Sequence, residues 1–331
     1  MSSDPTHKII LDSDGGVDDA MALYFALAHP QLELLGIATT FGNVSTAQAL
    51  SNAIYLCALA GRSVPVHEGV HTPTRKAPVR PDVLVHGADG LGNLPTRLAT
   101  SYAPDTRSSA RFIVEMAHAH PGQITLVVTG PMGNLYQALR LEPHLPELLR
   151  AVIVSGGSIL APGNVTPVAE ANIWHDPHAA DIIFTAGFAL SMVGLDVGQR
   201  MVMPLSLFEG LAAQHRHPAT DTLLHAARFY AGYCGQIQPE LAHPAACFGH
   251  DVLPLMLLLH PDRFDTQQGR VRVVPDGLAA GQTIMNRQPH LAYATDDWDA
   301  DIPMARVCLQ VDAAACLGLF EQTLRQDWLP R

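Results

Sequence analysis

Short apolar runs rich in β-branched residues alternate along the chain with longer segments of helical periodicity. The runs are continuously apolar, as in strands that are buried on both faces of a sheet. The expected strands are Ile9–Leu11, Leu34–Thr39, Ile124–Thr129, Val152–Ser155 and Leu190–Leu195. The expected helices include Val17–Ala28, Thr46–Ala60, Ser108–His118, Pro177–Thr185, Val252–Leu259 and Ala313–Leu324. This order predicts an α/β fold with a mostly parallel, Rossmann-like central sheet covered by helices.

Polar motifs follow several of the expected strands at their carboxyl ends, where ligands bind in sheets of this kind. These motifs are Asp12–Asp19, Thr39–Asn43, Thr129-Gly130, Ser155–Gly157 and Asp196. The pattern predicts one site at the carboxyl edge of the sheet.

Length and composition narrow the class of protein. The 331 residues contain no linker-like stretch and no repeat, which favours a single domain over residues 1–331. No apolar window reaches the roughly 18 residues of a membrane span, and no signal-peptide pattern opens the chain. The five cysteines form no C-x-x-C pair, as in a reducing compartment, so we expect a cytoplasmic protein that binds no membrane. The net charge of −11 argues against a nucleic-acid partner.

The strongest chemical signal is an acidic cluster directly after the first expected strand. Asp12, Asp14, Asp18 and Asp19 place four carboxylates within eight residues. Carboxylates so close together raise one another's pKa unless a cation neutralises them, so the segment predicts a site for a hard metal ion. A phosphatase of the haloacid-dehalogenase type also begins with an apolar strand and an Asp-x-Asp-Gly turn, and Thr129 could serve as its second motif. Such an enzyme usually needs a later lysine to hold the phosphate, and the only lysines are Lys8 and Lys76.

Residues Asp12 to Leu23 resemble the metal-binding signature of the inosine-uridine-preferring nucleoside hydrolase family, with Gly15 where the family often has proline. Five further segments resemble motifs of that family, and together they cover nearly the whole chain from Lys8 to Leu324. They are Phe41-Gly42-Asn43, the His-Gly-x-x-Gly loop that starts at His86, the segment Val127–Pro131 with Thr129, the segment Asn164–Asn172 and the pair His250-Asp251. The resemblance implies a nucleoside hydrolase fold and hydrolysis of the N-glycosidic bond of ribonucleosides, in purine or pyrimidine salvage.

The resemblance also implies a role for each matched residue. One Ca²⁺ per subunit would be held by Asp14, Asp19, Asp251 and the backbone carbonyl of Thr129. Asp14 would activate a water that the ion positions, and His250, helped by His86, would assist the leaving base. Asp12 would support the turn. The ribose would be bound by Asp18, Asn43, Asn164, Glu170 and Asn172.

Glu170 and Asn172 are expected to alternate along an extended segment and so to point to the same side. The glycines after His86 suggest a mobile lid. A small-molecule nucleoside is the expected partner, and the family habit is a homodimer or homotetramer. A catalytically silent ribose-binding protein would keep the metal site and Asn43, so it remains an alternative. The preferred base stays open, although Tyr230, Tyr233, Gln236 and Gln238 could line a base pocket.

Overall fold

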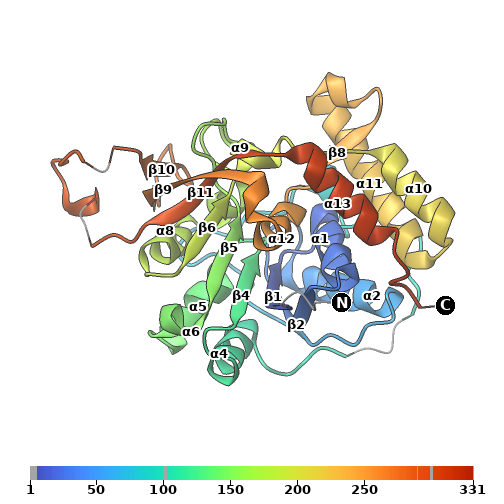
Figure 1. Ribbon diagram of the computed structural model, residues 1–331, viewed down its shortest axis with the longest axis horizontal. Helices are drawn as coiled ribbons and strands as arrows, with labels where there is room; N and C mark the ends of the chain where they lie inside the picture. The colour runs from blue at the N-terminus through green and yellow to red at the C-terminus, as the bar shows by residue number, and fades with distance from the viewer. Residues whose placement is uncertain (1–5, 100–102, 289, 299–300, 331) are drawn as a thin grey trace.

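A nine-stranded sheet runs through the computed structural model, which describes residues 6–99, 103–288, 290–298 and 301–330. The strand order is β10-β9-β11-β6-β5-β4-β1-β2-β3, and a second sheet pairs β7 with β8 (Figure 1). The strands are β1 (His7–Ser13), β2 (Leu32–Thr39), β3 (Val66–His67), β4 (Ile124–Val128), β5 (Ala151–Ser155), β6 (Leu190–Val193), β7 (Val202–Pro204), β8 (Ala246–Phe248), β9 (Phe264–Val273), β10 (Thr283–Asn286) and β11 (Ala305–Val311).

Neighbouring strands from β3 to β11 are parallel, whereas β9 and β10 add antiparallel pairs at one edge. Helices connect and cover the strands, as the sequence predicts for a mostly parallel sheet. The helices are α1 (Val17–Ala28), α2 (Thr46–Leu59), α3 (Val83–His86), α4 (Ser109–Ala119), α5 (Gly133–Leu141), α6 (Leu145–Leu148), α7 (Ala171–His175), α8 (Pro177–Thr185), α9 (Leu195–Gly198), α10 (Leu205–His215), α11 (Pro218–Ile237), α12 (Val252–Leu259) and α13 (Ala313–Leu324).

The apolar core forms two clusters, one on each face of the sheet. Ile9 and Leu11 of β1 belong to the cluster that includes side chains of α1, α2, α11, α12 and α13. Ile10 points to the opposite face and joins the cluster with α4, α5 and α8. Burial on both faces explains why the strand sequence is continuously apolar.

The predicted element boundaries are close to the observed ones, with two informative differences. The expected strand Leu190–Leu195 ends at Val193, because Leu195 already begins the short helix α9. The second difference is that strands β9 and β10 were not predicted. They lie at one edge of the sheet, and β9 is only partly buried. Its mixed apolar and polar sequence therefore lacks the continuous apolarity that marks the central strands.

The strand ends gather the polar motifs at one edge of the sheet. Strands β1, β2, β4, β5 and β6 are parallel neighbours and end at residues 13, 39, 128, 155 and 193. Within the described residues, no helix combines the length and apolarity that crossing a bilayer requires.

The contact between β2 and α4 gives a test of the fold. A methyl group on the buried Gly36 would overlap the ring of Phe112. Gly36→Ala should lower the free energy of unfolding by about 1–3 kcal/mol through overpacking. Gly318→Ala is the matched control, because Gly318 lies in α13 with open space around it. It should stabilise the helix by about 0.5–1 kcal/mol. Urea unfolding of both variants measures the difference, and an unchanged Gly36→Ala would contradict the packing.

Candidate active site

The acidic loop after β1 is buried, although it carries four carboxylates. Asp12, Asp14, Asp18 and Asp19 are each no more than 5 % exposed. Gly15 makes the turn with a φ of +76°, a left-handed conformation that glycine adopts without strain. Asp19 lies in the first turn of α1 and accepts a hydrogen bond from the backbone N–H of Gly16 at 2.9 Å. This hydrogen bond fixes the loop to the first turn of α1.

Neutral groups from neighbouring strand ends hydrogen-bond the acids. The backbone N–H of Asn43 donates to Oδ2 of Asp14 at 2.9 Å, and its side-chain amide donates to Oδ1 at 2.9 Å. The Thr129 hydroxyl donates to Oδ1 of Asp19 at 2.8 Å. Ser155 at the end of β5 donates to Oδ1 of Asp251 at 2.7 Å. These bonds orient Asp14, Asp19 and Asp251 toward the same edge of the sheet.

The acids form a group that could bind a metal ion. Carboxylate oxygens of Asp18, Asp19 and Asp251 lie within 4.8 Å of one another. Burial raises the pKa of Asp18 and Asp251, and nearby carboxylates raise it further. Oδ1 of Asp18 is buried without a hydrogen-bond partner among the described residues. Repelling, incompletely bonded oxygens of this kind fit a bound cation.

Asp14 and Thr129 lie beside this group. Burial raises the pKa of Asp14 well above its ordinary value, and the adjacent Asp19 carboxylate raises it further. The Thr129 carbonyl accepts a hydrogen bond from the Asn172 amide at 3.1 Å. Asp12 lies behind the loop, where Asn134 donates to its Oδ1 at 2.8 Å. That contact agrees with a supporting role for Asp12 in the turn.

The expected extended conformation of the Glu170–Asn172 segment is wrong. Glu170 caps α7, and its carboxylate accepts the backbone N–H groups of Asn172 and Ile173. Asn172 therefore lies in a helix, because the glutamate satisfies the open amides of the first turn. Both side chains nevertheless line the same cavity. The Asn172 amide also donates to the Ser155 carbonyl at 3.0 Å, and this leaves its oxygen for a ligand.

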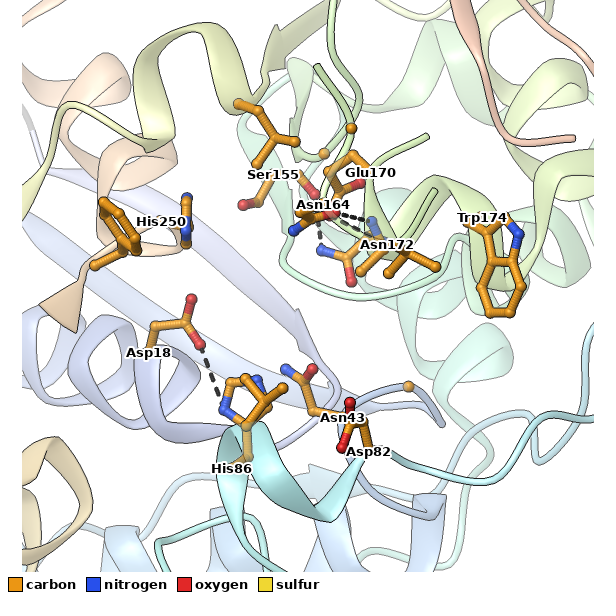
Figure 2. A pocket seen from close by; sticks show the side chains of 18 of the residues that line it. Asp18, Asn43, Asp82, His86, Ser155, Asn164, Glu170, Asn172, Trp174 and His250 are labelled. Atoms are coloured by element: carbon orange, nitrogen blue, oxygen red, sulfur yellow. Dashed lines mark hydrogen bonds and ion pairs between the residues drawn. The ribbon is translucent and has the colours of Figure 1, made fainter. Parts of the chain in front are cut away.

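Two histidines line the cavity on the same side as Asp18, and His86 is buried. Figure 2 shows His86, Asp18 and His250 on one side, with Asn164, Glu170 and Asn172 opposite them. Nδ1 of His86 accepts the backbone N–H of Val17 at 3.1 Å and lies 4.0 Å from Oδ1 of Asp18. Burial lowers the pKa of both histidines to about 4, and each lowering favours the neutral ring.

Asp18 and Asp251, together with the amides and the two histidines, border a cavity of about 810 Å³, a size that accommodates a small organic ligand. The residues that line it include Asn43, His86, Ser155, Asn164, Glu170, Asn172 and His250. Tyr230, Tyr233 and Gln238 line it, as the sequence suggests, but Gln236 does not. Sequence reasoning missed Trp174 and His175, which also line the cavity. They directly follow the matched Asn172, and their nearness to that motif was the only available signal.

The described geometry defines an α/β enzyme class: a helix-covered parallel sheet with buried acids, amides and histidines around a cavity at the carboxyl edge. Comparison with known proteins identifies the family within this class. Residues 9–318 match the family model described as inosine-uridine preferring nucleoside hydrolase.

Individual relatives match over almost the full length. A probable uridine nucleosidase 1 of Oryza sativa subsp. japonica is 33% identical over 96% of this chain and 96% of its own. The pyrimidine-specific ribonucleoside hydrolase RihB of Escherichia coli strain SE11 is 31% identical over 96% of this chain and 97% of its own. A solved structure, the plant nucleoside hydrolase PpNRh1, superposes with a TM-score of 0.90 at 34% identity, covering 97% of this chain and 99% of that one.

The chain belongs to the inosine-uridine preferring nucleoside hydrolase family. It is a hydrolase of N-glycosyl compounds that acts on ribonucleosides. This confirms the family resemblance and the fold predicted from the sequence. The individual roles of the site residues remain predictions.

Proposed function

We propose that the protein hydrolyses the N-glycosidic bond of ribonucleosides with the help of one Ca²⁺ per subunit and releases free base and ribose. The observation that carries the proposal is that buried acids, side-chain amides and two histidines line one cavity. Cleavage of this bond passes through a positively charged, oxocarbenium-like ribosyl group. Negative charge below the ribose and a donor near the base are what such a transition state needs.

Asp14, Asp19, Asp251 and the Thr129 carbonyl would hold the cation, with Asp18 close to them. Oxygen ligands alone are what Ca²⁺ prefers, and the donor set here consists of carboxylates and a carbonyl. The bound ion would supply positive charge and free coordination positions for oxygen atoms of the substrates. The unpartnered oxygen of Asp18 and the mutual repulsion of the acids support this fit.

Asp14 would accept the proton of the attacking water. Both of its oxygens are held by Asn43, through the backbone N–H and the side-chain amide. Each oxygen retains a further lone pair, so the carboxylate is oriented but still able to take a proton. Orientation of this kind is what a general base requires.

Ribose hydroxyls would be bound by Asp18, Asn43, Asn164, Glu170 and Asn172. Both N–H groups of the Asn172 amide are used by backbone carbonyls, at Thr129 and Ser155. Its oxygen would therefore accept a hydrogen bond from a ribose hydroxyl. Asn164 and Glu170 line the cavity beside it and would bind the 5′-hydroxyl.

The two histidines differ in what they offer the leaving base. Because Nδ1 of His86 accepts the Val17 N–H, the neutral ring carries its proton on Nε2. His86 can thus donate a hydrogen bond, but giving up that proton would leave an imidazolate. His250, whose ring packs against Phe248 with centroids 5.2 Å apart, is our candidate for proton delivery. It would act as the imidazolium, because a neutral ring that gave up its proton would also become an imidazolate.

The two alternative functions have less support. A phosphatase of the haloacid-dehalogenase type usually needs a lysine that holds the phosphate, yet Lys8 pairs with Glu33, and Lys76 donates to the Trp174 carbonyl. A silent ribose-binding protein would not need both Asp14 and a leaving-group donor. Release of free base from uridine, rather than phosphate from a phosphomonoester, separates these functions. Uridine is the first substrate to test because the relatives named above include a uridine nucleosidase and a pyrimidine-specific hydrolase.

We further infer a single domain over residues 1–331, supported by a sheet whose strands come from both ends of the chain. A cytoplasmic location is supported by five buried cysteines that all carry free thiols. A homodimer or homotetramer is the expected assembly, on the family resemblance.

Asp14→Asn tests the general base. The amide keeps the shape of the side chain but cannot accept the proton of water, so kcat for uridine should fall by at least about 10²–10⁴-fold. Steady-state kinetics at saturating substrate and calcium measures the effect. A variant with near wild-type kcat would show that another group activates the water.

Calcium binding can be tested by thermal unfolding. Calcium at 100 times its dissociation constant should stabilise the native protein by about 2.7 kcal/mol, and a chelator should reverse the shift. Asp251→Ala should abolish the stabilisation because it removes an anionic ligand. Glu33→Gln is the matched control, since Glu33 pairs with Lys8 at the surface. An equal calcium response of the Asp251 and Glu33 variants would contradict the assigned site.

His250→Ala separates leaving-group assistance from water activation. A natural base needs a proton or a strong hydrogen bond to depart, whereas p-nitrophenolate does not. The variant should hydrolyse uridine about 10²-fold more slowly and p-nitrophenyl riboside at nearly the wild-type rate. Equal losses on both substrates would assign His250 to the fold or the metal site instead.

A further inference from the structure

The loop between β5 and α7 carries Asn164 into the cavity but has little apolar anchoring of its own. Leu160, at its centre, is 60% exposed. Gly156 and Gly157 at its start both have positive φ values. A loop with few apolar contacts is held in one conformation mainly by hydrogen bonds.

The side chain of Asp196 supplies three of these bonds. Asp196 is in the first turn of α9, directly after β6, and is 7% exposed. Its Oδ1 accepts the backbone N–H groups of Leu160 at 2.7 Å and Ala161 at 3.0 Å. Its Oδ2 accepts the N–H of Ile159 at 2.8 Å. One buried carboxylate thus binds three consecutive amides.

A second side chain holds the residue before these three. The Ser158 N–H donates to the Thr283 hydroxyl at 2.8 Å, and that hydroxyl donates to the Ser158 carbonyl at 2.6 Å. Thr283 comes from β10, at the far edge of the sheet. The loop is therefore fixed from Ser158 to Ala161 by two different elements.

We infer that Asp196 is a positioning residue for the 5′ end of the ribose, acting through the loop that carries Asn164. Asp196 itself is not among the residues that line the cavity, whereas Asn164 is. Asn164 follows the last clamped amide by three residues. Its backbone N–H donates to the Ala169 carbonyl at 3.1 Å and its Oδ1 accepts the Ala171 N–H at 3.0 Å, so Asp196 fixes the start of the segment that these bonds complete. The inference rests on the proposed binding of the 5′-hydroxyl by Asn164.

Asp89 offers a matched control elsewhere in the chain. Its carboxylate also accepts three backbone N–H groups, from Leu91, Asn93 and Leu94, at 2.9, 2.8 and 2.9 Å. That loop follows His86, on the opposite side of the cavity from Asn164. Removing either carboxylate deprives three amides of their acceptor, but only Asp196 lies behind Asn164.

The experiment measures how much the enzyme gains from the 5′-hydroxyl, as the ratio of kcat/KM for uridine to that for 5′-deoxyuridine. In the wild type a hydrogen bond to a charged or buried group should make this ratio about 10- to 100-fold. Asp196→Ala should lower this ratio at least about threefold, with most of the loss on uridine, while the Glu170 contact keeps the remainder. Asp89→Ala should keep the wild-type ratio, because general destabilisation affects both substrates alike.

Two milder variants test the same role if Asp196→Ala does not fold. Asp196→Asn can keep the acceptor for Leu160 and Ala161 but not for Ile159, so its ratio should lie between those of wild type and Asp196→Ala. Thr283→Val removes one hydroxyl from another element and should lower the ratio in the same direction.

Asn164→Ala separates the positioning role of Asp196 from the proposed contact between Asn164 and the 5′-hydroxyl. If Asn164→Ala loses the 5′-hydroxyl preference while Asp196→Asn, Asp196→Ala and Thr283→Val retain it, the positioning role is wrong and the ribose contact stands. If Asn164→Ala retains the preference, the proposed contact is wrong, and the inference for Asp196 falls with it.

Discussion

Mutual repulsion among buried carboxylates is the constraint around which this active site is arranged. Asp14, Asp19 and Asp251 accept hydrogen bonds at the carboxyl edge of the sheet, and every such bond among the described residues comes from a neutral group. Neutral donors orient the oxygens but leave the negative charge uncompensated, and burial keeps water from screening it. A cation is the simplest way to stabilise such a cluster. The same charge would then lie below the ribose, where a positive transition state develops.

The sheet topology explains how distant segments meet at this cluster. Strand β1 lies between β4 and β2, so the loops after all three strands end side by side. Close packing there requires small residues: a methyl group on Gly130 would lie 2.9 Å from Cβ of Asp14, and one on Gly42 would overlap its carboxylate. The acid is thus surrounded by backbone on two sides. That enclosure is what removes Asp14 from solvent and raises its pKa, together with the charge of Asp19.

The sequence predicts those features that depend on local pattern. Continuous apolarity identified β1, β4 and β5, because these strands are buried on both faces, and the acidic motif identified the loop after β1. Features set by distant partners were harder to predict. The tautomer of His86 depends on the Val17 N–H, 69 residues away. The helical conformation of Asn172 was missed for a local reason, because Glu170, two residues before it, uses its carboxylate as a helix cap. Asp196 was recognised as a strand-end residue, but its three amide partners lie 35 to 37 residues earlier in the chain.

Aspartates in this protein have two different roles: some fix a loop, and others keep an oxygen for a cation or a substrate. Burial alone would raise the pKa of Asp89, but the amides of Leu91, Leu94 and Asn93 lower it below the ordinary value. Such a carboxylate is satisfied by the protein and fixes a loop. Asp18 is more deeply buried and keeps an oxygen without a hydrogen-bond partner among the described residues, and its pKa is raised by burial and by Asp19. Both residues are aspartates, so the difference in their pKa comes from their burial and their partners: backbone amides surround the Asp89 carboxylate, whereas Asp18 lies among other carboxylates.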